Sequence, residues 1–376
     1  MGVITLDDDG VIQEISQLKN ETESTEFYNG ILVPGFVNTH CHIELSHLKG
    51  SFETGTGMSG FIKQITELRE SSQIEKRVES LSMEMRDLYE SGVSAMADIS
   101  NSGESFKAKS ESPLYTRTFI EVFGTEQEHS SQIMSRALQL HKMAKDLGID
   151  AAPTPHSCYT MSAKLLSESS NAALSEGWLS YHNQESWEEE EMIRNGRGPL
   201  FRQYIKRGLS TPPVTGLSSL IYFLKILKST SNPDIGKILL VHNTFTDQES
   251  VTKAIDEIKN LFWAICPLSN IFIHNALPPL ELLRRHNAVI TIGTDSLSSN
   301  TTLSITDEIK CIHKFFPRIP LNEILEWSSF NGARFLGIED KFGSFERGKS
   351  PGVVLIENID WRSERLGEDS ISRRLV

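Results

Sequence analysis

Residues 31–42 read ILVPGFVNTHCH, a short apolar run that ends in two histidines separated by one residue. Further compact runs of β-branched and small residues follow it, and amphipathic stretches of ordinary helix length lie between them. The predicted strands are Leu32–Thr39, Val93–Ile99, Arg117–Val122, Ile149–Thr154, Trp178–His182, Lys237–His242, Phe262–Cys266 and Ala288–Thr294. The predicted helices are Phe61–Arg69, Glu79–Glu90, Ser130–Lys145, Ser162–Glu176, Leu217–Leu227, Asp247–Asn260 and Pro279–Arg285. This alternation predicts an α/β fold, a parallel (β/α)8 TIM barrel with functional groups at the carboxyl ends of its strands.

Both ends of the chain have strand character and predict a second, smaller unit. Two short apolar runs flank the acidic turn at residues 7–10, and Val353–Ile356 forms another run that we expect to pair with this N-terminal hairpin. We therefore expect residues 1–31 and 340–376 to form a small composite β-sandwich domain and residues 32–339 to form the barrel. Arg194–Thr215 is rich in Gly and Arg and is predicted to be a loop or lid insertion.

Composition limits the partners. The chain has 376 residues, 38% hydrophobic and 23% charged, which excludes a disordered or fibrous protein. Its formal charge of −13 leaves no excess cations for phosphates, and no apolar run approaches the roughly 18 residues that span a bilayer. We therefore expect neither nucleic acid nor a membrane as a partner, whereas a homodimer stays open. The acidic N-terminus and the four scattered cysteines, Cys41, Cys158, Cys266 and Cys311, predict a cytoplasmic protein with reduced thiols.

Metal-ligating side chains fall at three of the predicted strand ends. His40 and His42 are two residues apart, so that their imidazoles share one face of a strand. His182 ends the fifth strand and Asp295 follows the eighth. Three imidazoles and one carboxylate suit a divalent first-row ion, with Zn²⁺ as the first choice and iron as the alternative. The fourth strand does not end in a lysine that could bridge two metals, which indicates one ion per chain.

Other polar residues near these strand ends are candidates for catalysis and substrate binding. Glu185 lies three residues beyond His182, close enough to exchange protons with water at the metal. The alternative is that Glu185 only begins an acidic helix, and Glu188–Glu191 fit a solvent-exposed face of that helix. His242, at the end of the sixth strand, is a candidate for orienting the attacking hydroxide or the substrate. His156, after the fourth strand, is predicted to contact substrate rather than metal.

Several motifs together resemble the amidohydrolase superfamily, in particular its aminohydrolase branch of adenosine-type, guanine and cytosine deaminases and triazine hydrolases. The segments are PGFVNTHCH at 34–42, His182-x-x-Glu185, His242, CPLSN at 266–270, GTDSLSSN at 293–300 and GSFERGK at 343–349. The resemblance implies that His40, His42, His182 and Asp295 hold the metal and that Asp295 takes a proton from the attacking water. It further implies that Glu185 protonates a ring nitrogen of the substrate and that His242 steadies the hydroxide.

Glu44 bears on the identity of the substrate. It follows His42 by two residues and is expected to share the face of the histidines, where a carboxylate accepts hydrogen bonds from a ribose diol or a ring N–H. The alternative is a carboxylate that pairs with Lys49 or caps a loop. The string HCHIELS at 40–46 resembles deaminases of aminodeoxyfutalosine, which implies an adenosine-like or other aminated purine heterocycle. Two rival functions stay open: an amide or carbon–halogen hydrolase on the same scaffold, and a non-catalytic metal-binding assembly protein.

Overall fold

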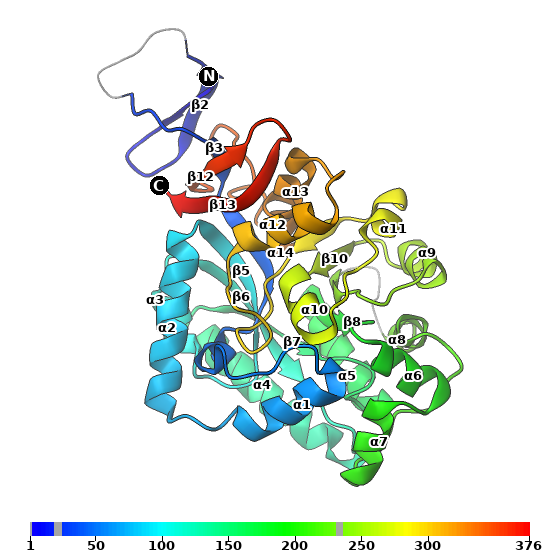
Figure 1. The fold of residues 1–376 in the computed structure, drawn as a ribbon. Coiled ribbons are helices and arrows are strands. Elements are labelled where there is room, and N and C mark those ends of the chain that lie inside the picture. The colour runs from blue at the N-terminus through cyan, green and yellow to red at the C-terminus, as the bar shows by residue number, and fades with distance from the viewer. Residues whose placement is uncertain (1, 19–24, 231–235) are drawn as a thin grey trace.

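The computed structural model describes residues 2–18, 25–230 and 236–376, and its centre is a barrel of parallel strands (Figure 1). The strands pair in two sheets of four, in the order β4-β5-β6-β7 and β8-β9-β10-β11. They are β4 Phe36–Cys41, β5 Val93–Ser100, β6 Tyr115–Val122, β7 Asp150–Pro155, β8 Trp178–Asn183, β9 Lys237–His242, β10 Leu261–Ile265 and β11 Ile290–Ile292. Each is almost wholly buried, as the apolar runs in the sequence indicate.

Two junctions close these sheets into one barrel. Between β7 and β8, the amide of His182 donates to the carbonyl of His156 at 2.9 Å. Between β11 and β4, the amides of Thr294 and Asp295 both donate to the carbonyl of His40, at 2.9 and 3.0 Å. The predicted (β/α)8 barrel is confirmed, and the second junction brings Asp295 beside the first predicted ligand.

The helices surround the barrel and cover its two ends. They are α1 Gly57–Leu68, α2 Ile74–Glu90, α3 Phe106–Glu111, α4 Ser130–Asp146, α5 Ala163–Ser175, α6 Trp187–Asn195, α7 Pro199–Lys206, α8 Ser219–Leu227, α9 Gln248–Glu257, α10 Pro267–His274, α11 Leu280–Arg285, α12 Ile305–Phe315, α13 Leu321–Trp327 and α14 Phe330–Leu336, with 3-10 helices η1 Ile43–Leu48 and η2 Gln127–His129. The predicted loop Arg194–Thr215 is wrong in part, because α7 lies within it. Gly198, with a φ of 101°, and Pro199 in the first turn begin that helix.

The amino ends of the strands are closed by α14. Phe335 of this helix stacks on Phe119 inside the barrel, with ring centroids 6.1 Å apart. The indole nitrogen of Trp178, the first residue of β8, donates to the backbone carbonyl of Phe335 at 2.8 Å. This end of the barrel is therefore filled by apolar packing. The opposite end of the barrel is the one where α/β barrels carry their active sites.

Both chain ends contribute to a separate β-region. In a three-stranded sheet, β12 (Val353–Asp360) pairs antiparallel with β3 (Ile31–Pro34) and with β13 (Arg365–Arg374). The hairpin of β1 (Gly2–Leu6) and β2 (Ile12–Gln17) forms its own two-stranded sheet. The predicted pairing of residues 353–356 with this hairpin is therefore wrong. Backbone hydrogen bonds join the hairpin to the end of the chain at Ile12, which bonds to Gly348 and Lys349.

The first predicted strand, Leu32–Thr39, is divided at Gly35 into β3 and β4. A Cβ at this position would meet Ser94 Oγ at 1.9 Å and the Pro351 carbonyl at 2.5 Å, so only glycine fits. Residues before Gly35 lie in the small sheet and residues after it lie in the barrel. The exact division of the chain into 1–31 with 340–376 and 32–339 stays a prediction, and residues 1 and 19–24 lie outside the described part. Within the described ranges, every helix is too short or too polar to cross a membrane.

Candidate active site

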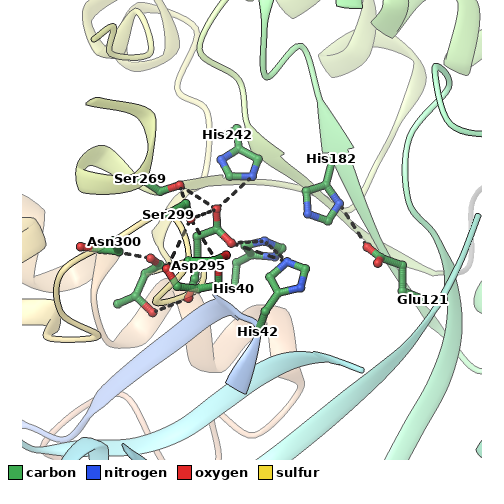
Figure 2. A network of polar contacts seen from close by, with 12 residues as sticks. His40, His42, Glu121, His182, His242, Ser269, Asp295, Ser299 and Asn300 are labelled. Carbon is green, nitrogen blue, oxygen red and sulfur yellow. Dashed lines mark hydrogen bonds and ion pairs between the residues drawn. The ribbon is translucent and has the colours of Figure 1, made fainter. Parts of the chain in front are cut away.

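Four histidines and one aspartate meet at the carboxyl ends of the barrel strands (Figure 2). His40 lies in β4 and His42 follows that strand, whereas His182 lies near the end of β8. His242 is the last residue of β9, and Asp295 comes three residues after β11. The structure thus brings together the four residues predicted to bind metal, and adds His242 to the same cluster.

The distances within the cluster fit a bound cation. His40 Nε2 lies 3.2 Å from His42 Nε2, and Asp295 Oδ1 is 3.9 and 3.6 Å from these two nitrogens. The ring of His182 lies 4.8 Å from that of His40. Burial, followed by the neighbouring imidazoles, lowers the pKa of His40 well below 6.5, so this ring is neutral and offers a lone pair. Neutral imidazoles converging with a carboxylate are the donor set that a divalent ion requires.

The backbone is held in unusual conformations at two of the strand ends. Asp295 and His242 have φ values of 57° and 71°, in the left-handed region that costs a non-glycine residue about 1–3 kcal/mol. Gly293 allows the close approach that sets Asp295, because a Cβ there would lie 2.7 Å from that of His40. These turns aim both side chains at the centre of the cluster, and such strain is typical of functional sites.

Neighbouring groups leave one oxygen of Asp295 for the cluster. Its Oδ2 accepts hydrogen bonds from the hydroxyls of Ser269 and Ser299, at 2.6 and 2.9 Å (Figure 2). Burial raises the pKa of Asp295, but His42, His242 and the Ser269 hydroxyl outweigh it and hold that pKa below 3.8. Asp295 is therefore an ionised carboxylate with Oδ1 directed at the histidines.

Glu185 is a buried carboxyl group that faces His242. The preceding residue, Gln184, adopts a φ of 43°, and this turn places Glu185 Oε1 3.5 Å from His242 Nε2. Burial raises the pKa of Glu185 well above 4.5, and the negative charge of Asp295 adds to the effect. His242 is held from its other side, where Nδ1 donates to Asn270 Oδ1 at 3.0 Å. A carboxyl that stays protonated near neutral pH can donate a proton to substrate.

His156 lies at the edge of the cluster. Its ring stacks on His182, with centroids 4.4 Å apart and an interplanar angle of 11°. Its Nδ1 contacts the hydroxyls of Ser157 and Thr160 at 2.7 and 3.1 Å, and burial lowers its pKa to about 3. His156 is therefore a neutral ring beside the ligand set, a position that fits its predicted contact with substrate.

The comparisons with known proteins agree with this geometry. Residues 31–365 match the model of the amidohydrolase family. The chain belongs to the amidohydrolase family. The resemblance inferred from the motifs is thereby confirmed, and so is the prediction that the chain is a hydrolase acting on C–N bonds.

Relatives of this amidohydrolase carry deaminase names. An adenosine deaminase of Helicobacter pylori is 28% identical over 86% of this chain and 78% of the relative. A 5'-deoxyadenosine deaminase of Methanococcus vannielii is 28% identical over 92% of this chain and 78% of its own length. The solved H. pylori aminofutalosine deaminase in complex with methylthio-coformycin has a TM-score of 0.77 at 25% identity, covering 96% of this chain and 88% of that one.

Glu44 of this amidohydrolase does not lie where the sequence pattern predicts. The strand ends at Cys41 and η1 begins at Ile43, so the two-residue alternation does not continue to Glu44. The Glu44 carboxylate accepts from the amide of Asn101 at 3.1 Å, from the amide and hydroxyl of Ser102 at 3.2 and 3.0 Å, and from the Ser105 hydroxyl at 3.2 Å. The expected shared strand face is wrong, because the strand ends before Glu44, and these contacts favour the loop-capping alternative. The contact of Glu44 with substrate stays a prediction. Lys49 pairs instead with Glu84, at 3.1 Å.

The structure also places residues that the sequence alone did not assign to the site of this amidohydrolase. Glu121 lies in β6, and its Oε1 is buried without a hydrogen bond among the described residues, 3.6 Å from His182 Nδ1. Its Oε2 accepts from the side-chain Nδ2 of Asn101 at 2.9 Å. A carboxylate on the outer nitrogen of a ligating histidine fixes the orientation and tautomer of the ring. The signal available was a lone glutamate next to the end of a predicted strand.

Proposed function

We propose that this amidohydrolase is a metal-dependent deaminase, which removes the exocyclic amino group of an adenosine-like purine and releases ammonia. One observation carries the proposal: the buried carboxyl of Glu185, with its raised pKa, faces the same cluster as three imidazoles and the carboxylate of Asp295. Hydrolysis of an amidine C–N bond needs both a proton donor and an activated water. The deaminase names of the relatives support this class of substrate.

Deaminases of this family bind a divalent metal, and the residues present fit one. His40, His42, His182 and Asp295 would hold it, because their donor atoms converge and the His40 imidazole is neutral. Zn²⁺ suits this mixture of nitrogen and oxygen donors, with iron as the alternative, and the four ligands indicate one ion per chain. When bound, the ion supplies the positive charge that makes a water molecule acidic enough to deprotonate near neutral pH.

The side chains of this chain then divide the proton transfers. Asp295 accepts a proton from the attacking water, because it is ionised and Ser269 and Ser299 occupy only its other oxygen. Glu185 donates a proton to the ring nitrogen beside the attacked carbon. His242 orients the attacking oxygen and the substrate, and His156 contacts the substrate ring. The oxygen of water adds to the carbon, Asp295 passes the proton it accepted to the amino group, and the C–N bond breaks with release of ammonia. The remaining hydroxyl proton returns to Glu185, so that both carboxyl groups regain their starting states.

The test is ammonia release from a panel of aminated purines by zinc-loaded protein. The panel includes adenosine, 5'-deoxyadenosine, aminodeoxyfutalosine and guanine, and the metal content is measured on the same sample. We expect about one ion per chain and turnover of an adenosine-like substrate. Loaded protein that releases no ammonia, but releases chloride from a chlorinated heterocycle, would establish the carbon–halogen alternative. Turnover of neither class would favour the non-catalytic alternative. The cytoplasmic location, the homodimer and the absence of nucleic-acid and membrane partners stay predictions.

A further inference from the structure

The acidic run Glu188–Glu191 differs from the solvent-exposed face that the sequence predicts. Glu188 and Glu189 are only 3% and 0% exposed. Glu188 accepts from the amide of Ser59 in α1 at 3.2 Å, and Glu190 accepts from the amide of Ser219 at the start of α8 at 3.0 Å. The side chains of residues 188–190 therefore turn toward the protein rather than the solvent, because backbone amides at the carboxyl ends of the strands need acceptors.

Glu189 is the member of this run that reaches the catalytic turn. Its Oε2 accepts from the amide of Glu185 at 2.9 Å, and its Oε1 accepts from the amide of Gln184 at 3.1 Å. The sequence S-x-x-E at 186–189 is a capping-box pattern, and Ser186 Oγ accepts from the Glu189 amide at 3.1 Å. In this chain, however, the glutamate reaches past the cap to the two residues before it. It thereby closes the turn that contains the left-handed Gln184.

The carboxyl group of Glu189, whose pKa burial raises to about 8, also contacts the neighbouring loop of the site. The thiol of Cys158 lies 4.0 Å from Glu189 Oε1, and Cys158 is two residues beyond His156. Glu189 thus lies between the turn that carries Glu185 and the loop that carries His156. Its two oxygens bond the backbone amides of residues 184 and 185, so we expect a change at Glu189 to displace Glu185 more than the proposed metal ligands.

We infer that Glu189 is a positioning residue for Glu185, which holds the carboxyl group of Glu185 toward His242 by clamping the amides of residues 184 and 185. The inference rests on the proposed role of Glu185 as proton donor. Small displacements of a reacting group cost up to roughly 10²-fold in rate. A residue that acts only through Glu185 lowers kcat and leaves KM and metal content nearly unchanged.

The test is a double-mutant cycle measured by ammonia release on the best substrate. In Glu189→Gln, the amide accepts from one of the two backbone N–H groups and points its own NH₂ group at the other. We expect kcat to fall about 10-fold or more, with KM within about threefold and full metal content. The matched control is Glu191→Gln on the same helix. The Glu191 side chain is partly exposed and pairs with Arg197 at 2.5 Å. We expect the kcat of this control to stay within about twofold of the wild type.

The second arm of the cycle separates this inference from the proposed function. If Glu189 acts through Glu185, adding Glu189→Gln to Glu185→Gln changes the residual kcat by less than about twofold. Two results would overturn the inference but leave the proposed function intact. One is an unchanged kcat in the single Glu189→Gln variant. The other is that adding Glu189→Gln to Glu185→Gln lowers kcat as much as it does in the wild type. Full activity of Glu185→Gln overturns the proposed proton donor itself. Glu189→Asp keeps the carboxylate but shortens its reach, and it takes the same place in the cycle, with the same expected result, if the glutamine variant does not fold.

Discussion

The turns after β4 and after β8 begin alike in sequence and end differently in space. In each, a glutamate follows a histidine of the cluster, Glu44 two residues after His42 and Glu185 three residues after His182. Glu44 accepts hydrogen bonds from four donors of the loop at 101–105. Glu185 turns inward and faces His242. A glutamate that lies close in sequence to a histidine of the cluster therefore does not necessarily face the cluster.

Local contacts explain the difference between the two turns. After β4, the Asp98 carboxylate accepts from the amide of Ile43 at 2.8 Å, at the start of the 3-10 helix that carries Glu44 to the loop at 101–105. After β8, the left-handed Gln184 and the clamp from Glu189 carry Glu185 inward. Burial raises the pKa of both glutamates, but at Glu44 the charge of Lys109 and the donors at residues 101 and 102 partly offset the effect, whereas at Glu185 negative neighbours reinforce it. The Glu44 carboxylate therefore suits the support of a loop, whereas the Glu185 carboxyl group suits proton transfer.

The largest expected effect is on the inward turn. Glu185→Gln keeps the size of the side chain but removes the transferable proton, so kcat is expected to fall at least about 10²-fold. Metal content and Tm stay near those of the wild type, because Glu185 is not among the proposed ligands. Steady-state ammonia release, elemental analysis and thermal unfolding check the three values. A metal-loaded Glu185→Gln protein with nearly full kcat would show that Glu185, like Glu44, has no part in proton transfer.

The turn after β4 is expected to affect stability instead. Glu44→Ala leaves four donors without their acceptor, and we expect the free energy of unfolding to drop by about 1–3 kcal/mol, with kcat/KM within about threefold. Denaturant unfolding and steady-state kinetics measure both. Glu44→Gln, which keeps an acceptor for the two backbone amides, is the milder control. A rise of 10-fold or more in KM with unchanged stability would restore Glu44 as a substrate contact.

The smallest expected effect is on the pH dependence of stability. The folded pKa of Glu185 lies above its unfolded value, so this residue stabilises the fold fully below about pH 4.5 and loses that contribution as pH rises through the folded pKa. In metal-free protein, Glu185→Gln should therefore gain Tm relative to the wild type between pH 5 and 8, by roughly a few degrees at most. Glu191→Gln, which removes an exposed carboxylate whose pKa Arg197 lowers, should show no such gain. If the difference in Tm between Glu185→Gln and the wild type does not change with pH, the raised pKa of Glu185 is contradicted.

The order of strands and the residues that cluster at their carboxyl ends could be predicted because both depend on local pattern. Buried parallel strands are apolar runs, and residues at their carboxyl ends meet in a barrel wherever they lie in the chain. His40, His182 and Asp295 were accessible to this reasoning although they lie far apart in sequence. Glu121 was not, because nothing in its surroundings in the sequence distinguishes it from any strand glutamate.

The sequence by itself determined the barrel, the convergence of the histidines with Asp295, and the presence of Glu185 near them, because periodicity and strand ends are local properties. Only the tertiary structure decided which way each glutamate turns, that β3 rather than the hairpin pairs with β12, and that Glu188 and Glu189 are buried. These outcomes depend on where backbone amides from distant segments lack an acceptor. A buried carboxylate points toward hydrogen-bond donors, and those donors come from segments that only the folded chain brings close to it.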